Sequence, residues 1–221
     1  MIDVSVLVPT YHRPEFLARA LDSIAAQDFS GSYEAVVVHD GDDVAFGTAF
    51  HYQPFPCTFA VQPHAGLSAT VNRAFELSKG RYVTVLADDD VIRPMKLRVM
   101  HDYLERSHLC DVVYGLAERG PDPLRQGFVP SNYAAFLGAH PTINSRPDDT
   151  IWIHGTATMY RREAWERVGG YDLKDQRAEE YRMHERMLCA GVMFHGLDVV
   201  TDGYCQHDEQ KSVTRTMAHA H

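Results

Sequence analysis

The chain has 221 residues, of which 45% are hydrophobic and 23% are charged, as in an ordinary globular protein. Its formal net charge of −9 disfavours a polyanionic partner that is bound by bulk electrostatics, so nucleic acid is not the default partner. No apolar run approaches the roughly 20 residues that a membrane-spanning helix needs.

Cysteine usage indicates the compartment. The four cysteines stand far apart and form no Cys-x-x-Cys pair, which favours isolated thiols over a disulfide framework or a zinc site. The beginning of the chain also lacks the layout of a signal peptide. We therefore expect a cytoplasmic protein, with peripheral contact at a membrane surface as the alternative.

In the first half of the chain, short valine-rich runs alternate with amphipathic stretches, which predicts alternating strands and helices. The expected strands are VSVLV (4–8), EAVVVHD (34–40), CTFAVQ (57–62), RYVTVLADDD (81–90) and DVVYGL (111–116). The expected helices are PEFLARALDSIAAQ (14–27), LSATVNRAFELSKG (67–80) and PMKLRVMHDYLERS (94–107). Such alternation predicts a single α/β domain with a mostly parallel central sheet and helices on both faces. Ligands of such sheets collect at the carboxyl ends of the strands.

The second half is less regular. Residues 119–150 contain five of the eleven prolines, so we expect loops there, apart from a short helix near 131–137. This segment either shapes a substrate site or is an exposed connection. IWIHGTATMYRREAWERVGG (151–170) predicts a strand, a helix and a glycine stop, and AEEYRMHERMLCAG (178–191) predicts a last helix.

Polar residues follow three of the expected strands. Thr10 and Tyr11 follow the first strand, Asp40 follows the second, and the triplet 88–90 follows the fourth. In a parallel sheet these residues line one crevice, which suits a polar nucleotide. Taken singly, Thr10 also fits a plain helix entry, and Asp40 with Gly41 is a common turn pair.

The aspartate triplet is the most informative of these features. Carboxylates together with substrate phosphates are the ligands that Mg²⁺ and Mn²⁺ prefer. Side chains of alternate residues at a strand end point the same way, whereas those of neighbours diverge. An exposed acidic loop is the alternative interpretation of the triplet.

Five blocks in order resemble the family 2 glycosyltransferases of the GT-A fold, which is Rossmann-like. They span nearly the whole chain and read VSVLVPTYHRPEFLARALDSIAAQ, VVVHDGD, GLSATVNRAFELSKGRYVTVLADDDVIRPMKL, MYRREAWERVGGYD and EEYRMHERMLCAG. The resemblance implies a metal-dependent, inverting transfer of a sugar from a nucleotide diphosphate sugar, with a UDP-sugar favoured, to an acceptor hydroxyl. It divides the domain into a nucleotide-sugar half (1–118) and an acceptor-side half (119–221). The favoured acceptor is a saccharide or a lipid-linked glycan, and nucleic acid is a less favoured one.

Position by position, the resemblance implies a donor site. Thr10 and Tyr11 match the start of the family's nucleotide pocket, and Asp40 matches the aspartate that binds the donor base. Asp88 matches the acid that faces the ribose. The sequence departs from the family pattern at His12, where asparagine is common, at His39, where an acid is frequent, and at Ala87, which replaces the first acid of the commonest Asp-x-Asp-Asp form.

The resemblance also implies a metal site and a base. Asp89 matches the acid that faces the metal (Mn²⁺ or Mg²⁺), and Asp90 is a further candidate ligand. His207 matches a late histidine that helps bind the metal or the diphosphate, although by itself it fits a loop histidine. Glu180 matches the catalytic base, usually aspartate, with Glu179 as a rival. Acids in the first turn of a helix also stabilise the macrodipole without any catalytic role.

Two other function classes stay open. A nucleotidyltransferase uses a similar sheet and metal, but it should have a glycine-rich phosphate loop with a basic residue after the first strand. The segment PTYHRPEF is not such a loop. A non-catalytic module that binds a nucleotide sugar or a glycan would keep the aspartates and lose the base. A donor-hydrolysis assay separates that module from an enzyme.

Overall fold

The computed structural model describes residues 2–43, 46, 53–120, 153–175, 179–205 and 207, and these form an α/β fold around one sheet. Eight strands within the described ranges are hydrogen-bonded in the order β3-β2-β1-β4-β7-β6-β8-β5. Their bounds are β1 (Val4–Thr10), β2 (Tyr33–Asp40), β3 (Cys57–Gln62), β4 (Tyr82–Val85), β5 (Val91–Ile92), β6 (Val112–Gly120), β7 (Thr158–Arg161) and β8 (Phe194–Cys205).

Half of the sheet is purely parallel. β1 pairs in parallel with both β2 and β4, and β2 pairs in parallel with β3. The carboxyl ends of β1, β2 and β4 therefore lie at one edge, as the sequence predicts. A backbone hydrogen bond of 2.9 Å from Leu86 N to Leu7 O continues the β1–β4 contact past the end of β4. The turn that carries the aspartate triplet begins directly after it.

The other half of the sheet departs from the simple alternation. β6 is a strand, as expected, but the antiparallel strand β7 separates it from β4. β6 also extends to Gly120, two residues into the segment expected to be loop, and residues 121–152 lie outside the described part, including the helix expected at 131–137. β5 and β8 have no counterpart among the predicted strands. β8 pairs with β6 in parallel and with β5 antiparallel.

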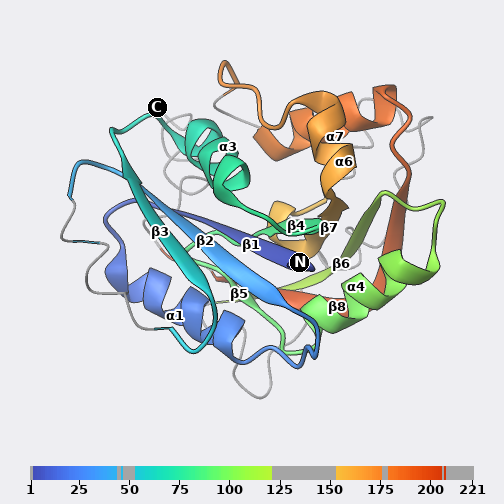
Figure 1. Ribbon diagram of the computed structural model, residues 1–221, viewed down its shortest axis with the longest axis horizontal. Coiled ribbons are helices and arrows are strands. Elements are labelled where there is room, and N and C mark those ends of the chain that lie inside the picture. Colours follow the sequence, from blue (N-terminus) through green and yellow to red (C-terminus); the bar gives the residue numbers. More distant parts are fainter. Residues whose placement is uncertain are drawn as a thin grey trace.

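Helices cover both faces of the sheet, which confirms the expected layers. In Figure 1, α1 and α4 lie on one side, and α3, α6 and α7 lie on the other. The helices are α1 (Pro14–Ala25), α3 (Leu67–Leu77), α4 (Lys96–Arg106), α6 (Arg162–Val168) and α7 (Glu179–Cys189), with a short 3₁₀ turn η1 (Gly155–Ala157) before β7. The predicted glycine stop is present, because Gly169 ends α6 with a left-handed φ of 73°.

Two hydrophobic cores result from the alternation of side chains along the central strands. Val4, Val6 and Val8 of β1 face the core beneath α1 and α4. Leu7 faces the opposite core, where Trp165 of α6 is 1% exposed. Since successive strand residues point to opposite faces, a strand buried on both sides reads as a continuous apolar run.

Candidate active site

Two predicted site residues meet where β1 and β4 end. The hydroxyl of Thr10 donates a hydrogen bond of 2.8 Å to Asp88 Oδ2, and both side chains are almost fully buried. Asp88 lies in the turn between β4 and β5, which a 3.0 Å bond from Asp90 N to Ala87 O closes. Burial raises the pKa of Asp88 to about 6, against the opposing effect of a neighbouring arginine.

That arginine is Arg13, which sequence reasoning did not single out. It immediately precedes α1, and its guanidinium contacts both carboxylates at the strand end. Nη2 and Nε bond Asp88, the latter at 3.3 Å, and Nη1 lies 2.9 Å from Asp89 Oδ2. Burial lowers the pKa of Arg13, but the two negative charges outweigh this effect and raise it. A cation in the first turn after a strand, upstream of an acidic triplet, is the signal that could have identified it.

Asp89 also meets a residue that is distant in sequence. His207 Nε2 lies 3.0 Å from Asp89 Oδ2, and both side chains are about 15% exposed. Among the described residues, no group of three or more His, Cys, Asp or Glu side chains is placed to bind a metal ion. One carboxylate and one imidazole still fit Mn²⁺ if phosphate oxygens complete its shell, because this cation accepts oxygen ligands from protein and substrate together.

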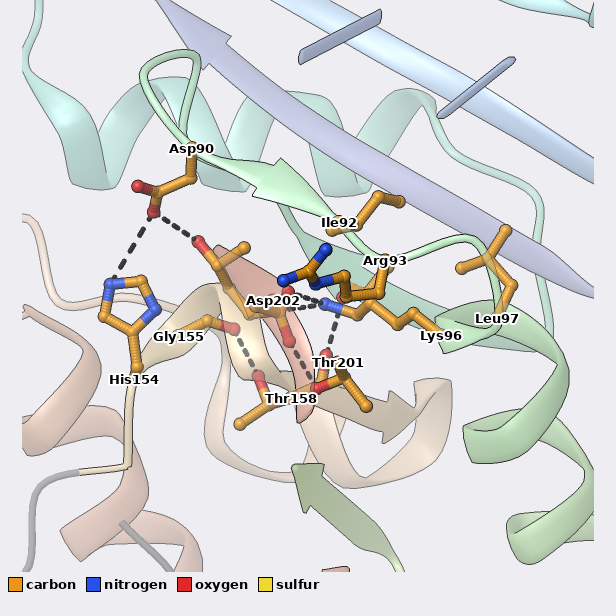
Figure 2. A network of polar contacts seen from close by, with 12 residues as sticks. Asp90, Ile92, Arg93, Lys96, Leu97, His154, Gly155, Thr158, Thr201 and Asp202 are labelled. Carbon is orange, nitrogen blue, oxygen red and sulfur yellow. Dashed lines mark hydrogen bonds and ion pairs between the residues drawn. The ribbon is translucent and has the colours of Figure 1, made fainter. Parts of the chain in front are cut away.

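Asp90 has different partners from the other two carboxylates. It is 2% exposed, and it accepts hydrogen bonds of 3.1 Å from both Thr156 Oγ1 and Cys205 N. His154 Nε2 lies 3.6 Å away (Figure 2). Burial raises the pKa of Asp90 strongly. The structure thus directs Asp90 toward η1 and β8, and its role as a metal ligand stays a prediction.

Asp40, at the end of β2, is buried and fully engaged. Oδ1 accepts hydrogen bonds of 2.8 Å from Gln62 Nε2 and Ala65 N, and Oδ2 accepts one of 2.8 Å from Gly66 N. His64 Nδ1 lies 2.9 Å from Oδ2. Burial raises the pKa of Asp40, but these hydrogen bonds outweigh it and lower the pKa. A carboxylate has about four acceptor positions, so a donor base can pair with Asp40 only by replacing one of these groups.

His64 is the replaceable one of these groups, because its side chain is 63% exposed. Its ring lies 4.7 Å from the ring of Tyr11, which is 48% exposed. His12, whose φ is 49°, packs edge-on against Tyr11 at 4.6 Å. The ends of β1 and β2 therefore carry an accessible wall of aromatic and imidazole rings, a surface on which a planar base can stack.

Glu179 and Glu180 form the first turn of α7, as predicted, but their surroundings differ. Glu179 is 8% exposed and Glu180 is half-buried. The carboxylate of Glu180 lies against η1, because a Cβ added at Gly155 would come within 2.3 Å of Glu180 Oε1. Burial is the main cause that raises the pKa of Tyr171, and the negative charge of Glu180 is the second. A side chain at position 155 would therefore require the Glu180 carboxylate to move from this position.

Comparisons with known proteins identify the family of the chain. The family model described as "Glycosyl transferase family 2" matches residues 5–169. An uncharacterized glycosyltransferase of Rickettsia typhi is 29% identical over 219 residues, which cover 96% of this chain and 66% of that protein. The Streptococcus pneumoniae "Glycosyltransferase GlyA" is 34% identical over 114 residues, or 50% of this chain and 15% of that protein. The chain thus spans two thirds or less of the length of these relatives.

Solved structures share the fold. The S. aureus protein TarS (residues 1–349), in complex with UDP-GlcNAc, superposes with a TM-score of 0.75 at 20% identity. The match covers 95% of this chain and 60% of that one. At this level of identity, the likeness establishes the architecture alone, and that architecture is the GT-A fold expected from the sequence.

Proposed function

Because the chain belongs to glycosyl transferase family 2, we propose that it transfers a sugar from a nucleotide diphosphate sugar to an acceptor hydroxyl with inversion. The observation that carries the proposal is the junction at the end of β4. There, Asp88 bonds Thr10 while Asp89 meets His207, so a nucleotide-side carboxylate and a metal-side carboxylate stand next to each other.

The donor is proposed to bind across the ends of β1 and β2. Tyr11 provides a face for the base, Asp40 accepts a hydrogen bond from it after His64 moves aside, and Asp88 faces the ribose. We favour a UDP-sugar, since TarS of the same fold was solved with UDP-GlcNAc. The mannosyltransferase structure from Pyrobaculum calidifontis, which has the same fold, contains GDP-Man and Mn²⁺. Both UDP- and GDP-sugars are therefore candidate donors.

Asp89 and His207 are the residues proposed to bind Mn²⁺ or Mg²⁺, with Asp90 as a further candidate. When bound, the cation supplies positive charge to the leaving diphosphate as a Lewis acid. The chain contributes a second positive charge through Arg13, whose guanidinium already lies beside both aspartates.

Glu180 is the proposed base, with Glu179 as its rival. The acceptor oxygen forms a bond to the anomeric carbon while the bond from that carbon to the diphosphate oxygen breaks. The hydroxyl proton moves to the carboxylate of Glu180, and the nucleoside diphosphate leaves. A single displacement of this kind inverts the anomeric centre and needs no enzyme nucleophile.

The proposed acceptor and location rest on net charge and on cysteine chemistry. We propose a saccharide or a lipid-linked glycan, because a net charge of −9 disfavours a polyanionic acceptor. The division into a donor half (1–118) and an acceptor-side half (119–221) fits the placement of Glu180 in the second half. All four cysteines lie in the described part of the chain and form no disulfide there, which fits the reducing cytoplasm. In the part of the chain that the structure describes, no helix has the length and apolarity to cross a membrane.

The test is a turnover screen of UDP- and GDP-sugars with simple acceptors, after EDTA treatment and with stepwise return of Mn²⁺. Asp89→Asn should still bind the nucleotide but lose metal-dependent turnover, and NMR of the wild-type product should show an inverted anomer. Asp28→Asn, an exposed carboxylate that pairs with Arg98, is the matched control and should behave as wild type. Nucleotide-sugar binding without turnover would identify a binding module, and a retained anomeric configuration would reject the displacement mechanism.

A further inference from the structure

A fully buried ion pair lies next to the candidate site, and neither of its residues is among the donor-binding, metal or base residues proposed above. Lys96 and Asp202 are both 0% exposed, and Lys96 Nζ lies 2.7 Å from Asp202 Oδ1 (Figure 2). Lys96 is the first residue of α4, and Asp202 lies in β8 opposite Ile92 of β5. The hydroxyl of Thr201 adds a hydrogen bond of 2.5 Å to Asp202 Oδ2.

Fold stability alone does not explain such a pair. Removing two charges from water is costly, and replacing a buried ion pair by apolar residues of similar size is often neutral or stabilising. The pair makes a further contact with the candidate site, because Lys96 Nζ also donates a hydrogen bond to the backbone carbonyl of Thr156 in η1. Among the described residues, Lys96 thus joins the start of α4 to η1 and to β8.

The turn η1 is the place where the two sides of the candidate site meet. On one side, Thr156 Oγ1 donates to Asp90 Oδ2, the carboxylate adjacent in sequence to Asp89. On the other side, the absent side chain of Gly155 leaves the space that the Glu180 carboxylate occupies. Thr158 Oγ1 bonds Gly155 O at 2.5 Å and keeps the turn closed.

Asp202 leads to the same place along β8. Three residues further on, Cys205 N donates a hydrogen bond of 3.1 Å to Asp90 Oδ1, and two residues after that His207 meets Asp89. Lys96 is therefore one hydrogen bond away from η1. Asp202 lies on β8, which ends two residues before His207. A shift of Lys96 would therefore move η1, and with it the Glu180 carboxylate that lies against Gly155, relative to the carboxylates at the strand end.

We propose that Lys96, paired with Asp202, is a positioning residue for the transfer step, which fixes η1 so that Glu180 keeps its place relative to Asp89 and His207. This inference rests on the proposed function. It predicts that loss of the pair affects the chemical step more than it affects nucleotide binding, because the contacts of Asp40, Thr10 and Asp88 do not pass through η1.

The experiment removes both charges together, in Lys96→Met/Asp202→Asn, so that no unpaired buried charge remains to unfold the protein. Ser5→Ala is the matched control. Its hydroxyl is buried and bonds Glu34 at 2.8 Å and Gly80 N at 2.8 Å, far from η1 in the hydrogen-bond network. Urea unfolding, the Kd for the nucleotide, kcat, and amide hydrogen exchange of residues 155–157 and 179–183 are measured for both variants and for wild type.

In the double variant we expect a near-normal nucleotide Kd, faster exchange at η1 and at the start of α7, and a kcat lower by on the order of 10²-fold, as misplacement of a reacting group by about 1 Å can cause. Ser5→Ala should change unfolding but not kcat. A folded double variant with unchanged kcat, or with unchanged exchange at 155–157, would overturn the inference while the proposed function stands. A wild type that transfers no sugar would instead reject the proposed function and this inference with it.

Discussion

Arg13 and Asp89 form an ion pair in which Arg13 Nη1 lies 2.9 Å from Oδ2, the same oxygen that His207 Nε2 reaches at 3.0 Å. The guanidinium therefore occupies a side of the carboxylate that a divalent cation would use. A cation entering here has to displace Arg13 from Asp89, or share the oxygen against the repulsion of a positive charge.

Replacing Arg13 by Gln should therefore tighten the binding of Mn²⁺ measured without nucleotide. A partly buried ion pair of about 1 kcal/mol corresponds to a roughly five-fold change in Kd. Isothermal titration with Mn²⁺ alone gives the comparison. Arg98→Gln also removes one positive charge but lies in an exposed pair with Asp28, so it should leave the Kd unchanged. Weaker Mn²⁺ binding in Arg13→Gln would show that Arg13 supports the metal site rather than competing with the metal.

Glu180→Gln should lower kcat by roughly 10² to 10⁴-fold, the usual contribution of general base catalysis, with the nucleotide Kd near the wild-type value. The amide keeps the size of the side chain against Gly155 and removes the basic oxygen. Glu179→Gln is the control on the same helical turn and should do less. The opposite order of the two variants would transfer the role to Glu179, and two active variants would show that neither is the base.

Asp40→Ala should weaken nucleotide binding more than Mn²⁺ binding. A charge-assisted hydrogen bond of about 1.5–3 kcal/mol predicts a loss in nucleotide affinity of roughly 10- to 100-fold. The control is Gln62→Ala, which removes one donor to Asp40 and keeps the carboxylate. His64→Ala probes the exchange directly, since it removes the imidazole beside Oδ2 and should not weaken binding. Titration calorimetry measures both affinities. A larger loss of affinity for Mn²⁺ than for the nucleotide would exclude Asp40 as the residue that binds the base.

His184 should make the fold sensitive to acid. It is 5% exposed, its Nε2 lies 2.7 Å from the Tyr160 hydroxyl, and Phe194 packs against its ring. Burial lowers the pKa of His184 to about 4. Because the unfolded chain has a pKa near 6.5 there, it binds more protons than the folded state between about pH 4 and 6.5.

Stability should therefore be fully present above pH 6.5 and fall as the pH drops through this window, by up to about 3 kcal/mol from this residue. Urea unfolding at pH 7.5 and at pH 5 measures the loss. His184→Gln keeps a polar partner for Tyr160 and should show a smaller difference between the two pH values than wild type. An equal difference in both proteins would show that His184 does not carry the effect.

Much of the donor side could be predicted from local sequence. The runs around Val6, Val37 and Val83 are mostly apolar, with Ser5 and Thr84 as the polar members, which is typical of strands buried on both faces. Parallel pairing of such strands then places Thr10, Asp40 and Asp88 at one edge, whatever the details of packing. The ends of α1, α6 and α7 likewise follow from proline, glycine and acidic residues at positions that local backbone chemistry determines.

Tertiary structure decided which oxygen meets which partner. Three adjacent aspartates are equivalent in sequence, but Asp88 turns to Thr10, Asp89 to His207 and Asp90 to Thr156, because segments separated by 66 to 118 residues supply the partners. β8 carries polar residues and glycine and has no strand-like period, so its strand conformation follows from pairing with β6 and β5. The sequence predicts an exposed Lys96 at the start of a helix. In the structure it is buried in an ion pair with Asp202, which lies 106 residues later in the chain. Hydrophobic periodicity is a local property of the chain, whereas the direction of a polar side chain depends on donors and charges that only the folded chain brings within reach.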